Sequence, residues 1–408
     1  MVNSQTAVNP FATRLLEKFS HAQRKMQDGA RNVLGSLDTR IAATPCDIVY
    51  TEDRVRLKHY RPVTPQRVKT PVLITYALIN RETMLDLQPG RSVVRSFLDR
   101  GVDVYMIDWG TPTRKDRYLT IDDHVNGYMD SMVDVVRRRT HSQQINLMGI
   151  CMGGTFSVMY AAMHPHKVKN LVTTVSPTNF DTEQGLLHIW LRDMDVDHMI
   201  EAFGNIPGDL LNFAFLLLNP ARLMVDKYVG LLDNIEDKAF LENFVRMEKW
   251  IFDSPDVPGE TFRQFMKDCY QKNLLIKNKM KLGDRRVDLN NLTMPLLNFY
   301  GRFDHLVPPE ACERLVEVVP SRDATNICLD TGHIGIYVSS KCQKAFAPKI
   351  VEWLTEREMP PKPKRKPEKK VRAPQPQKNL FHEQVPMDIG ATQLGVVPSD
   401  NPQHAQNV

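Results

Sequence analysis

The sequence has no apolar run long enough to cross a membrane. A membrane-spanning helix needs roughly 18 consecutive apolar residues, whereas an apolar run such as 213–218 is far shorter. Residues 1–10 also lack the basic start and the apolar centre of a secretory signal. We therefore expect a cytoplasmic protein without a membrane span.

Cysteines are few and scattered. None of the six forms a C-x-x-C pair, the spacing typical of zinc and redox sites, and in a reducing compartment we expect free thiols. The sequence also has no P-loop and no dinucleotide-binding fingerprint. We therefore expect no structural zinc and no bound cofactor.

One acidic run has the beginning of a calcium-binding loop but not its remainder. Asp193, Asp195 and Asp197 alternate with other residues, yet His198 stands where the loop needs glycine and Gly204 where it needs glutamate. We interpret this run as a solvated acidic stretch near a helix, and we expect no metal site there.

Positive charge is concentrated near the C-terminus. Of the formal net charge of +5, most falls after Glu358, where eight Lys or Arg residues face four acids. The rest of the chain is nearly neutral. Segment 359–408 is rich in Pro, Lys and Gln and poor in large apolar residues, so we expect it to be disordered. A basic tail can bind nucleic acid, but a solvated tail or linker is the simpler interpretation.

Short apolar runs alternate with helical patterns from residue 71 to about 181. This alternation is typical of βαβ units around a parallel sheet. In the helix predicted over 121–138, Thr120 can cap the first turn, and the sheet pattern returns after residue 291. The predicted strands are 72–79, 104–107, 145–150, 171–175, 296–300 and 325–329, and the predicted helices are 92–100, 121–138, 309–318 and 343–355.

The remaining segments complete the predicted domain organisation. Residues 182–290 mix large apolar side chains with acids and turn signals and contain no strand-like run, which predicts a mostly helical cap insertion. Apolar residues at helical spacing over 10–35 predict an amphipathic helix. We therefore predict an N-terminal helical segment (1–40), an α/β core (41–181 and 291–358), the cap (182–290) and a basic tail (359–408).

The strongest local signal is the segment 149–154, Gly-Ile-Cys-Met-Gly-Gly. It follows an apolar run and precedes a helical pattern, which is the arrangement of a nucleophile elbow with Cys151 in place of serine. The helix N-terminus would favour the thiolate, and the N–H of Met152 would be one oxyanion donor. A buried cysteine in a glycine-rich turn is the alternative.

Two further residues stand where this fold places the partners of its nucleophile. In the α/β-hydrolase fold the acid and then the histidine follow the nucleophile, each on a loop after a late strand. Asp304 follows the predicted strand 296–300, and His333 follows 325–329. His305 is an alternative base, although neighbouring side chains on an extended loop point in different directions, so we expect it to line the substrate channel.

These segments together resemble the polyhydroxyalkanoate synthases. The likeness runs over residues 40–356 and includes 77–81, 108–110, 149–154, 304–308 and 332–337. Segments 247–255 and 259–263 are similar to class III, in which a short catalytic subunit works with a companion subunit. The family usually continues Asn80-Arg81 with proline, whereas Glu82 stands here, so the shape of that loop is expected to differ.

The resemblance implies an acyltransferase with an α/β-hydrolase fold, a mostly parallel sheet flanked by helices with a helical cap (lid). By this likeness Cys151 is the acylated nucleophile, His333 its base and Asp304 the acid. Asn80, Met152 and His305 would bind substrate. The resemblance also implies a CoA thioester as substrate. Its implied partners are a companion synthase subunit and further copies of this chain, and the enzyme would associate with polyester granules.

The implied reaction converts (R)-3-hydroxyacyl-CoA, above all 3-hydroxybutyryl-CoA, into polyester with release of CoA. A hydrolase such as a thioesterase could use the same three residues with water as the acceptor. A non-catalytic granule or scaffold protein is a further alternative, against which the complete set of three residues argues.

Overall fold

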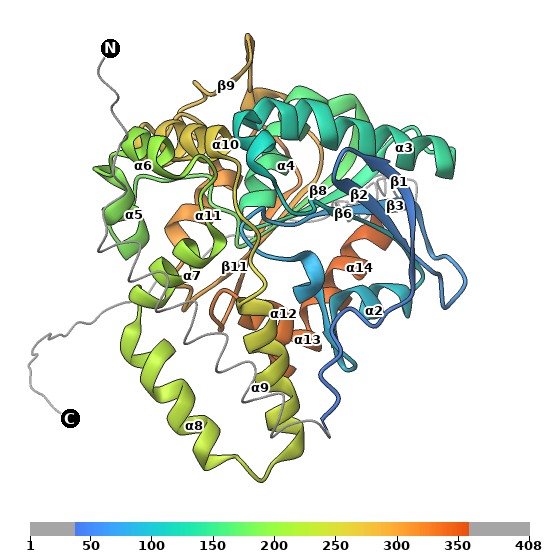
Figure 1. Cartoon of the computed structure of the whole chain (residues 1–408). Helices are drawn as coiled ribbons and strands as arrows, with labels where there is room; N and C mark the ends of the chain where they lie inside the picture. Colours follow the sequence, from blue (N-terminus) through green and yellow to red (C-terminus); the bar gives the residue numbers. More distant parts are fainter. Residues whose placement is uncertain (1–36, 359–408) are drawn as a thin grey trace, which may run out of the picture. The chain divides into compact units, whose positions relative to one another are not determined.

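The computed structural model describes residues 37–358, which lie within one compact unit, Met1–Pro361. The helix predicted over 10–35 and the basic tail over 359–408 lie outside the described residues. Figure 1 shows the described chain in sequence colours, from the first strands in blue to the last helix in red.

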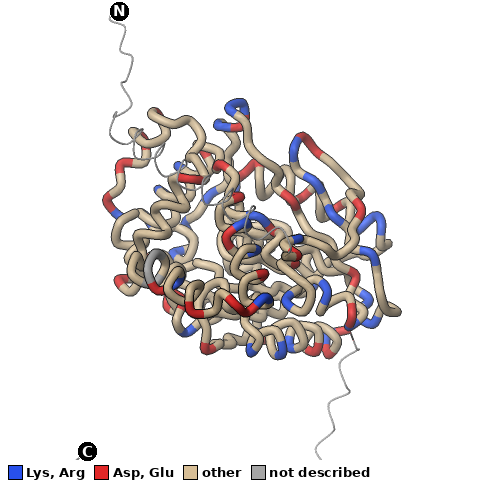
Figure 2. Tube along the Cα trace, turned by 60° about the horizontal axis from the view of Figure 1, so that its bottom comes forward, with Lys and Arg blue, Asp and Glu red and all other residues tan. Residues whose placement is uncertain are grey.

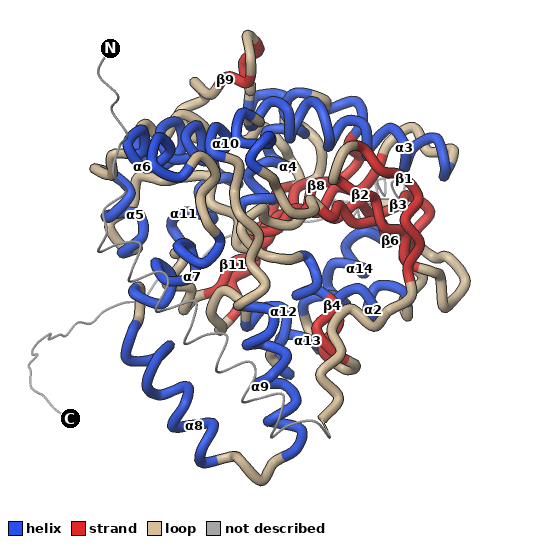
Figure 3. Tube along the Cα trace, viewed as in Figure 1, coloured by secondary structure: helices blue, strands red, loops and turns tan. Residues whose placement is uncertain are grey.

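An eight-stranded sheet forms the centre of this unit, as the red strands of Figure 3 show. The first three strands, counted from one edge, pair antiparallel with one another. From the third strand to the opposite edge, all neighbouring strands are parallel. In spatial order the strands are β1 (Cys46–Glu52), β2 (Val55–Tyr60), β6 (Val102–Asp108), β3 (Val68–Thr75), β7 (Ile145–Ile150), β8 (Val168–Thr174), β11 (Leu296–Gly301) and β12 (Ala324–Leu329).

Helices cover both faces of the sheet (Figure 1). On one face α3 (Asp130–Thr140) and α4 (Met152–Met163) pack on β3 and β7, and on the other α2 (Val93–Leu98) and α14 (Phe346–Glu356) pack on β6 and β3. This arrangement confirms the predicted α/β-hydrolase architecture. The other elements of the core are η1 (Glu82–Leu85), β4 (Asp86–Gln88), β5 (Arg91–Ser92), η2 (Arg114–Tyr118), η4 (Pro165–Lys167), η7 (Leu289–Asn291), α11 (Pro309–Val318), α12 (Gly335–Val338) and α13 (Ser340–Gln343).

The helix predicted over 121–138 begins at the expected residue. The N–H and hydroxyl of Thr120 both donate to the Asp123 carboxylate, at 2.8 and 2.7 Å, and the Asp123 N–H donates back to Thr120 Oγ1 at 3.1 Å. This reciprocal pairing satisfies N–H groups that have no partner within the helix. The first turns widen into the π-helical η3 (Asp123–Met129) before α3 begins, which apolar spacing does not reveal.

Helices dominate the chain between β8 and β11. The Tyr228 hydroxyl donates to Glu248 at 3.0 Å, which joins α8 (Lys227–Asp233) to α9 (Lys238–Ile251). This region also contains two short antiparallel strands that no apolar run indicated, and Gly283 (φ +54°) allows the tight turn between them. The elements are α5 (Leu186–Arg192), α6 (Val196–Phe203), α7 (Gly208–Leu217), η5 (Ala221–Asp226), α8 (Lys227–Asp233), α9 (Lys238–Ile251), α10 (Gly259–Gln264), η6 (Phe265–Gln271), β9 (Lys281–Leu282) and β10 (Arg285–Arg286).

The acidic run at 193–197 has a structural role in this region. The Asp195 carboxylate accepts a hydrogen bond from the His198 N–H at 3.1 Å and so caps α6. Asp197 pairs with Lys267 and with Arg263, which joins α6 to the following helices. Within residues 37–358 there is no cluster of three or more His, Cys, Asp or Glu side chains arranged to hold a metal ion. In the same described part, no helix is long and apolar enough to span a bilayer.

Candidate active site

Cys151 occupies the turn between β7 and α4 in a strained conformation. Its φ of 53° and ψ of −126° are unfavourable for a residue with a side chain, and such a conformation costs about 1–3 kcal/mol. The turn is held because the Cys151 N–H donates to the Thr174 carbonyl at 2.9 Å, while β7 and α4 fix its two ends. The side chain is half-buried at the carboxyl edge of the sheet.

Three glycines make this turn possible because neighbouring atoms leave no room for a side chain at these positions. A Cβ atom at Gly149 would come 2.5 Å from Ser157 Oγ, one at Gly153 would come 2.3 Å from the Tyr76 carbonyl oxygen, and one at Gly154 would come 1.7 Å from Ser176 Oγ. The glycines therefore let α4 begin directly beside the ends of β3 and β8.

Asp304 and His333 meet at the same edge, although 29 positions separate them in the sequence. Asp304 Oδ2 lies 2.7 Å from His333 Nδ1, and Oδ1 accepts hydrogen bonds from the N–H groups of Leu306 and Val307 at 2.9 and 2.8 Å. The two residues are only 4% and 8% exposed. The carboxylate is thus held by its own loop and in turn fixes the imidazole.

The Cys151 side chain also lies near His333 and acts on its pKa. Burial alone would lower the pKa of His333, but the charge of Asp304 and then that of Cys151 outweigh burial and raise it to about 10. The arrangement therefore favours a proton on the imidazole. The structure brings together the three residues that the sequence predicted as nucleophile, base and acid.

The residues predicted to bind substrate lie on α4, on the loop after β3 and on the loop of Asp304. Met152 is the first residue of α4, so its N–H has no acceptor within its own helix and can serve as an oxyanion donor. Asn80 Oδ1 accepts a hydrogen bond from the Ser254 hydroxyl, which ties the loop after β3 to the end of α9. His305 is half-buried on the loop of Asp304.

Comparison with known proteins identifies the family. Residues 70–340 match the alpha/beta hydrolase fold family, and residues 8–97 match the N-terminus of poly-beta-hydroxybutyrate polymerase (PhaC). The poly(3-hydroxyalkanoate) polymerase subunit PhaC of Thiocystis violacea is 48% identical over 84% of this chain and 97% of its own length. This chain belongs to the poly(3-hydroxyalkanoate) polymerase (PhaC) family.

Further PhaC proteins show comparable similarity. The subunit of Allochromatium vinosum is 46% identical over 84% of this chain and 98% of its own length, and that of Synechocystis is 48% identical over 82% and 91%. Among solved structures, a candidate lipase from Sulfolobus solfataricus covers 76% of this chain and 99% of its own at 15% identity, with a TM-score of 0.50. At this identity the likeness supports the fold alone.

Glu82 stands at the position where PhaC sequences were expected to carry proline, and it is buried. Its carboxylate pairs with Lys58, whose Nζ also lies 3.0 Å from Asp108. Burial, followed by the charge of Asp108, raises the pKa of Glu82. In this PhaC chain, an ion-pair network therefore fixes the loop that leads from Asn80 to η1.

Three buried tyrosines that sequence reasoning missed lie within reach of the charge of Cys151. Burial and then other nearby charges, including that of Cys151, raise the pKa of Tyr76, Tyr270 and Tyr337. Their hydroxyls therefore stay protonated at neutral pH and can donate hydrogen bonds. Tyr337 belongs to segment 332–337, whose resemblance to the family could have identified it as a site residue. No motif in the sequence marks Tyr76 or Tyr270.

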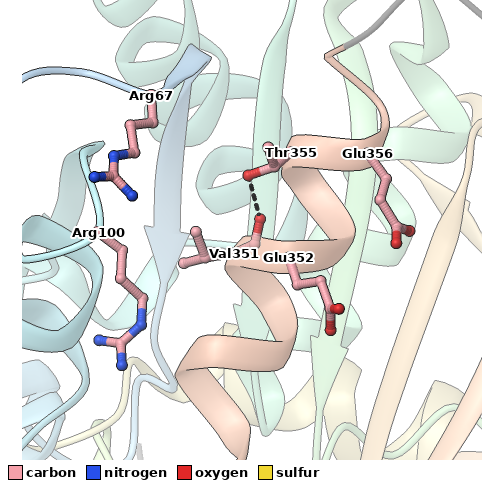
Figure 4. Close-up of a pocket in the computed structure, with 6 residues that line it drawn as sticks. All are labelled: Arg67, Arg100, Val351, Glu352, Thr355 and Glu356. Atoms are coloured by element: carbon pink, nitrogen blue, oxygen red, sulfur yellow. Dashed lines mark hydrogen bonds between the residues drawn. The ribbon is translucent and has the colours of Figure 1, made fainter.

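A separate surface hollow lies away from these residues. It measures about 370 Å³ and lies beside α14, where Val351 is on the side of Arg67 and Arg100 and the Glu352 and Glu356 side chains point away from the two arginines (Figure 4). None of its lining residues belongs to the Cys151 site.

Charged residues of both signs are mixed along the described chain. Figure 2 shows Lys and Arg interspersed with Asp and Glu, which agrees with the nearly neutral charge of this part of the chain.

Proposed function

We propose that this chain polymerises (R)-3-hydroxyacyl-CoA, and in particular 3-hydroxybutyryl-CoA, into polyhydroxyalkanoate with release of CoA. The contact of His333 with both Asp304 and Cys151 carries the proposal. It gives a nucleophile, a base and an oriented acid in a chain whose relatives are named poly(3-hydroxyalkanoate) polymerases. The CoA thioester is the substrate, and the proposed reaction requires no cofactor.

In the first step the Cys151 thiolate attacks the thioester carbonyl. The new C–S bond to Cys151 forms as the bond to CoA breaks, and the imidazolium of His333 protonates the departing CoA sulfur. The oxyanion is stabilised by the Met152 N–H, with Asn80 beside the reacting carbonyl. One thioester replaces another, so the step is close to balanced in free energy.

The second step uses the same imidazole as a base. Acylation removes the negative charge of Cys151, which is one of the causes that raise the pKa of His333, so the neutral imidazole becomes easier to form. It takes the proton of a 3-hydroxyl group, whose oxygen then attacks the acyl carbon. The ester bond forms, the C–S bond breaks, and the proton on His333 again faces a thiolate.

If water attacked the acyl group in place of the hydroxyl, the reaction would be hydrolysis, so the enzyme must keep water away from the acylated cysteine. We propose that residues 182–290 act as a cap that admits acyl-CoA and excludes water. The burial of Asp304 and His333 supports this role. Supplying 3-hydroxybutyryl-CoA and analysing the product tests the function: polymer with free CoA is expected, whereas free 3-hydroxybutyrate alone would indicate a thioesterase, and no CoA release would indicate a non-catalytic protein.

The finer assignments rest on the class III resemblance. We propose that a companion subunit and self-association are needed for full activity, and that the enzyme is cytoplasmic and granule-associated. Residues 41–181 and 291–358 would form the catalytic core, with 1–40 as a helical segment and 359–408 as a tail. Specific activity should rise when the chain is purified with a companion subunit, and equal activity without it would contradict the proposal.

A further inference from the structure

His188 is a buried histidine whose two ring nitrogens have no hydrogen-bond partner among the residues the structure describes. It lies on the inner face of α5 and is 1% exposed. Leaving a buried donor or acceptor unpaired is unfavourable, and native structures show few such groups. A side chain with two of them therefore calls for an explanation.

A second buried histidine shows how the fold normally treats this residue. His124 is also surrounded by aromatic rings and fully buried, but its Nδ1 is 2.8 Å from the Thr120 carbonyl oxygen and 3.3 Å from the Thr261 hydroxyl. Only its Nε2 is without a partner among the described residues, whereas His188 has none at either nitrogen. His124 thus links two segments of the structure. His188 makes no corresponding link within residues 37–358, so holding the fold together does not account for it.

The position of His188 relates it to the Cys151 site. Its ring packs against Tyr270 with centroids 5.0 Å apart, and the charge of Cys151 acts on the Tyr270 hydroxyl. A Cβ atom at Gly185 would come 2.7 Å from His188 Nδ1 and 3.3 Å from Pro308, so the imidazole lies close to the end of the loop that carries Asp304.

The imidazole is electrically neutral in this environment. Burial lowers the pKa of His188 to about 4, despite the opposing charge of Asp304. A neutral imidazole has one N–H donor and one nitrogen acceptor. A hydroxyl group is its natural complement, because a hydroxyl both donates and accepts.

We propose that His188 recognises the 3-hydroxyl group of the acyl chain bound at Cys151. This inference rests on the proposed function, which makes a 3-hydroxyacyl group the substrate. That hydroxyl is two carbons from the carbonyl that Cys151 attacks. An acyl chain lying between α5 and the Asp304 loop gives a partner to a ring nitrogen that otherwise has none. His188 is then a specificity-determining residue, separate from the nucleophile, base and acid.

The test compares two CoA thioesters that differ only in this hydroxyl. The rate of CoA release in a single turnover is measured with 3-hydroxybutyryl-CoA and with butyryl-CoA, for the wild type and for His188→Leu. We expect the wild type to prefer the hydroxylated substrate by about tenfold, which is the factor that one net hydrogen bond provides. In His188→Leu this preference should disappear, mainly through slower reaction of the hydroxylated substrate.

Two further variants make the result specific. Leu191→Val changes a buried apolar residue on the same helix and should affect both substrates alike. His188→Gln retains a donor and an acceptor and should keep part of the preference. Because His188→Leu removes unpaired buried nitrogens, its thermal unfolding midpoint should equal or exceed that of the wild type.

The outcomes separate this inference from the proposed function. CoA release with an unchanged substrate ratio in His188→Leu would overturn the role of His188 and leave acyl transfer in place. Failure of His188→Leu to fold would also overturn it, because the nitrogens would then be needed for structure. No CoA release by the wild type, alone or with its companion subunit, would instead refute the proposed function.

Discussion

Gly154 and Ser176 lie so close that a Cβ atom at position 154 would come 1.7 Å from Ser176 Oγ. Gly154→Ala should therefore displace the start of α4 and destabilise the protein by about 1–3 kcal/mol, as overpacking does. Gly230→Ala in α8 is the control, because no atom lies within 4 Å of its Cβ position, and alanine there should stabilise by up to about 1 kcal/mol. Urea unfolding measures both effects, and equal stability of the two variants would contradict the crowding at Gly154.

Replacement of the proposed nucleophile should leave the fold intact. Cys151→Ala is expected to lower CoA release by about 10⁴-fold or more and to change unfolding free energy by less than about 1 kcal/mol. Cys151→Ser should also be very slow, since an alcohol ionises far less readily than a thiol. Single-turnover assays with circular dichroism test this, and substantial CoA release by the alanine variant would exclude Cys151 from the reaction.

The protonation of His333 should depend on Cys151. Its pKa is raised from the ordinary value of 6.5 to about 10, partly by the charge of Cys151. Cys151→Ala should therefore lower the pKa of His333, which NMR titration can measure, with His333→Gln used to assign the signal. An unchanged pKa in Cys151→Ala would show that the thiolate does not act on the imidazole.

The same shift predicts how stability varies with pH. The folded protein binds the His333 proton more tightly than the unfolded chain does, so protonation of His333 stabilises the fold. This contribution to the unfolding free energy is complete below pH 6.5 and is lost as the pH rises through about 10. The unfolding free energy of the wild type should therefore fall more steeply between pH 6.5 and 10 than that of Cys151→Ala. Parallel curves for the two proteins would contradict this linkage.

Asp304→Asn should separate the two steps of the reaction. The thiol needs little assistance to react, whereas the hydroxyl of the second step needs a well-oriented base. We expect Asp304→Asn to acylate Cys151 measurably but to elongate very slowly, so that short oligomers remain bound to the enzyme. Mass spectrometry after brief exposure to substrate reports both steps, and equal loss of acylation and elongation would place Asp304 in the thiol step.

Removal of the tail should preserve the chemistry if the cut falls after Met359. Glu358 must be kept, because its carboxylate accepts the Thr70 N–H at 3.0 Å and pairs with Lys169 at 2.8 Å. A chain ending at Met359 is expected to release CoA at the full-length rate, and one ending at Arg357 should be less stable by about 1–2 kcal/mol. A folded but inactive protein ending at Met359 would give the tail a role in catalysis.

The sequence predicted the sheet and the three central residues because both follow from strong local patterns. A parallel strand that is buried on both faces appears in the sequence as a continuous apolar run. The residues just after such a run can therefore be assigned to the loop at the carboxyl end of the strand. The edge strand β1 and its neighbour β2 escaped prediction because exposed residues interrupt their apolar pattern. The strand predicted to reach residue 79 ends at Thr75, and the next residue, Tyr76, packs tightly against Gly153.

Roles that depend on three-dimensional neighbours could not be predicted in this way. His188 is a single histidine in a helix, and only its burial without a partner sets it apart. The contact of Glu82 with Lys58 joins positions 24 residues apart that share no motif. Burial and pairing of this kind appear only once the chain is folded.

The order of the site residues along the chain has a consequence for protein synthesis. Cys151 leaves the ribosome long before His333, and β11 and β12, whose ends present the acid and the histidine, are the last two strands of the sheet. A nascent or prematurely terminated chain can therefore expose the thiol but not the assembled site. Acyl transfer should begin only when translation is nearly finished, so incomplete chains would not consume acyl-CoA.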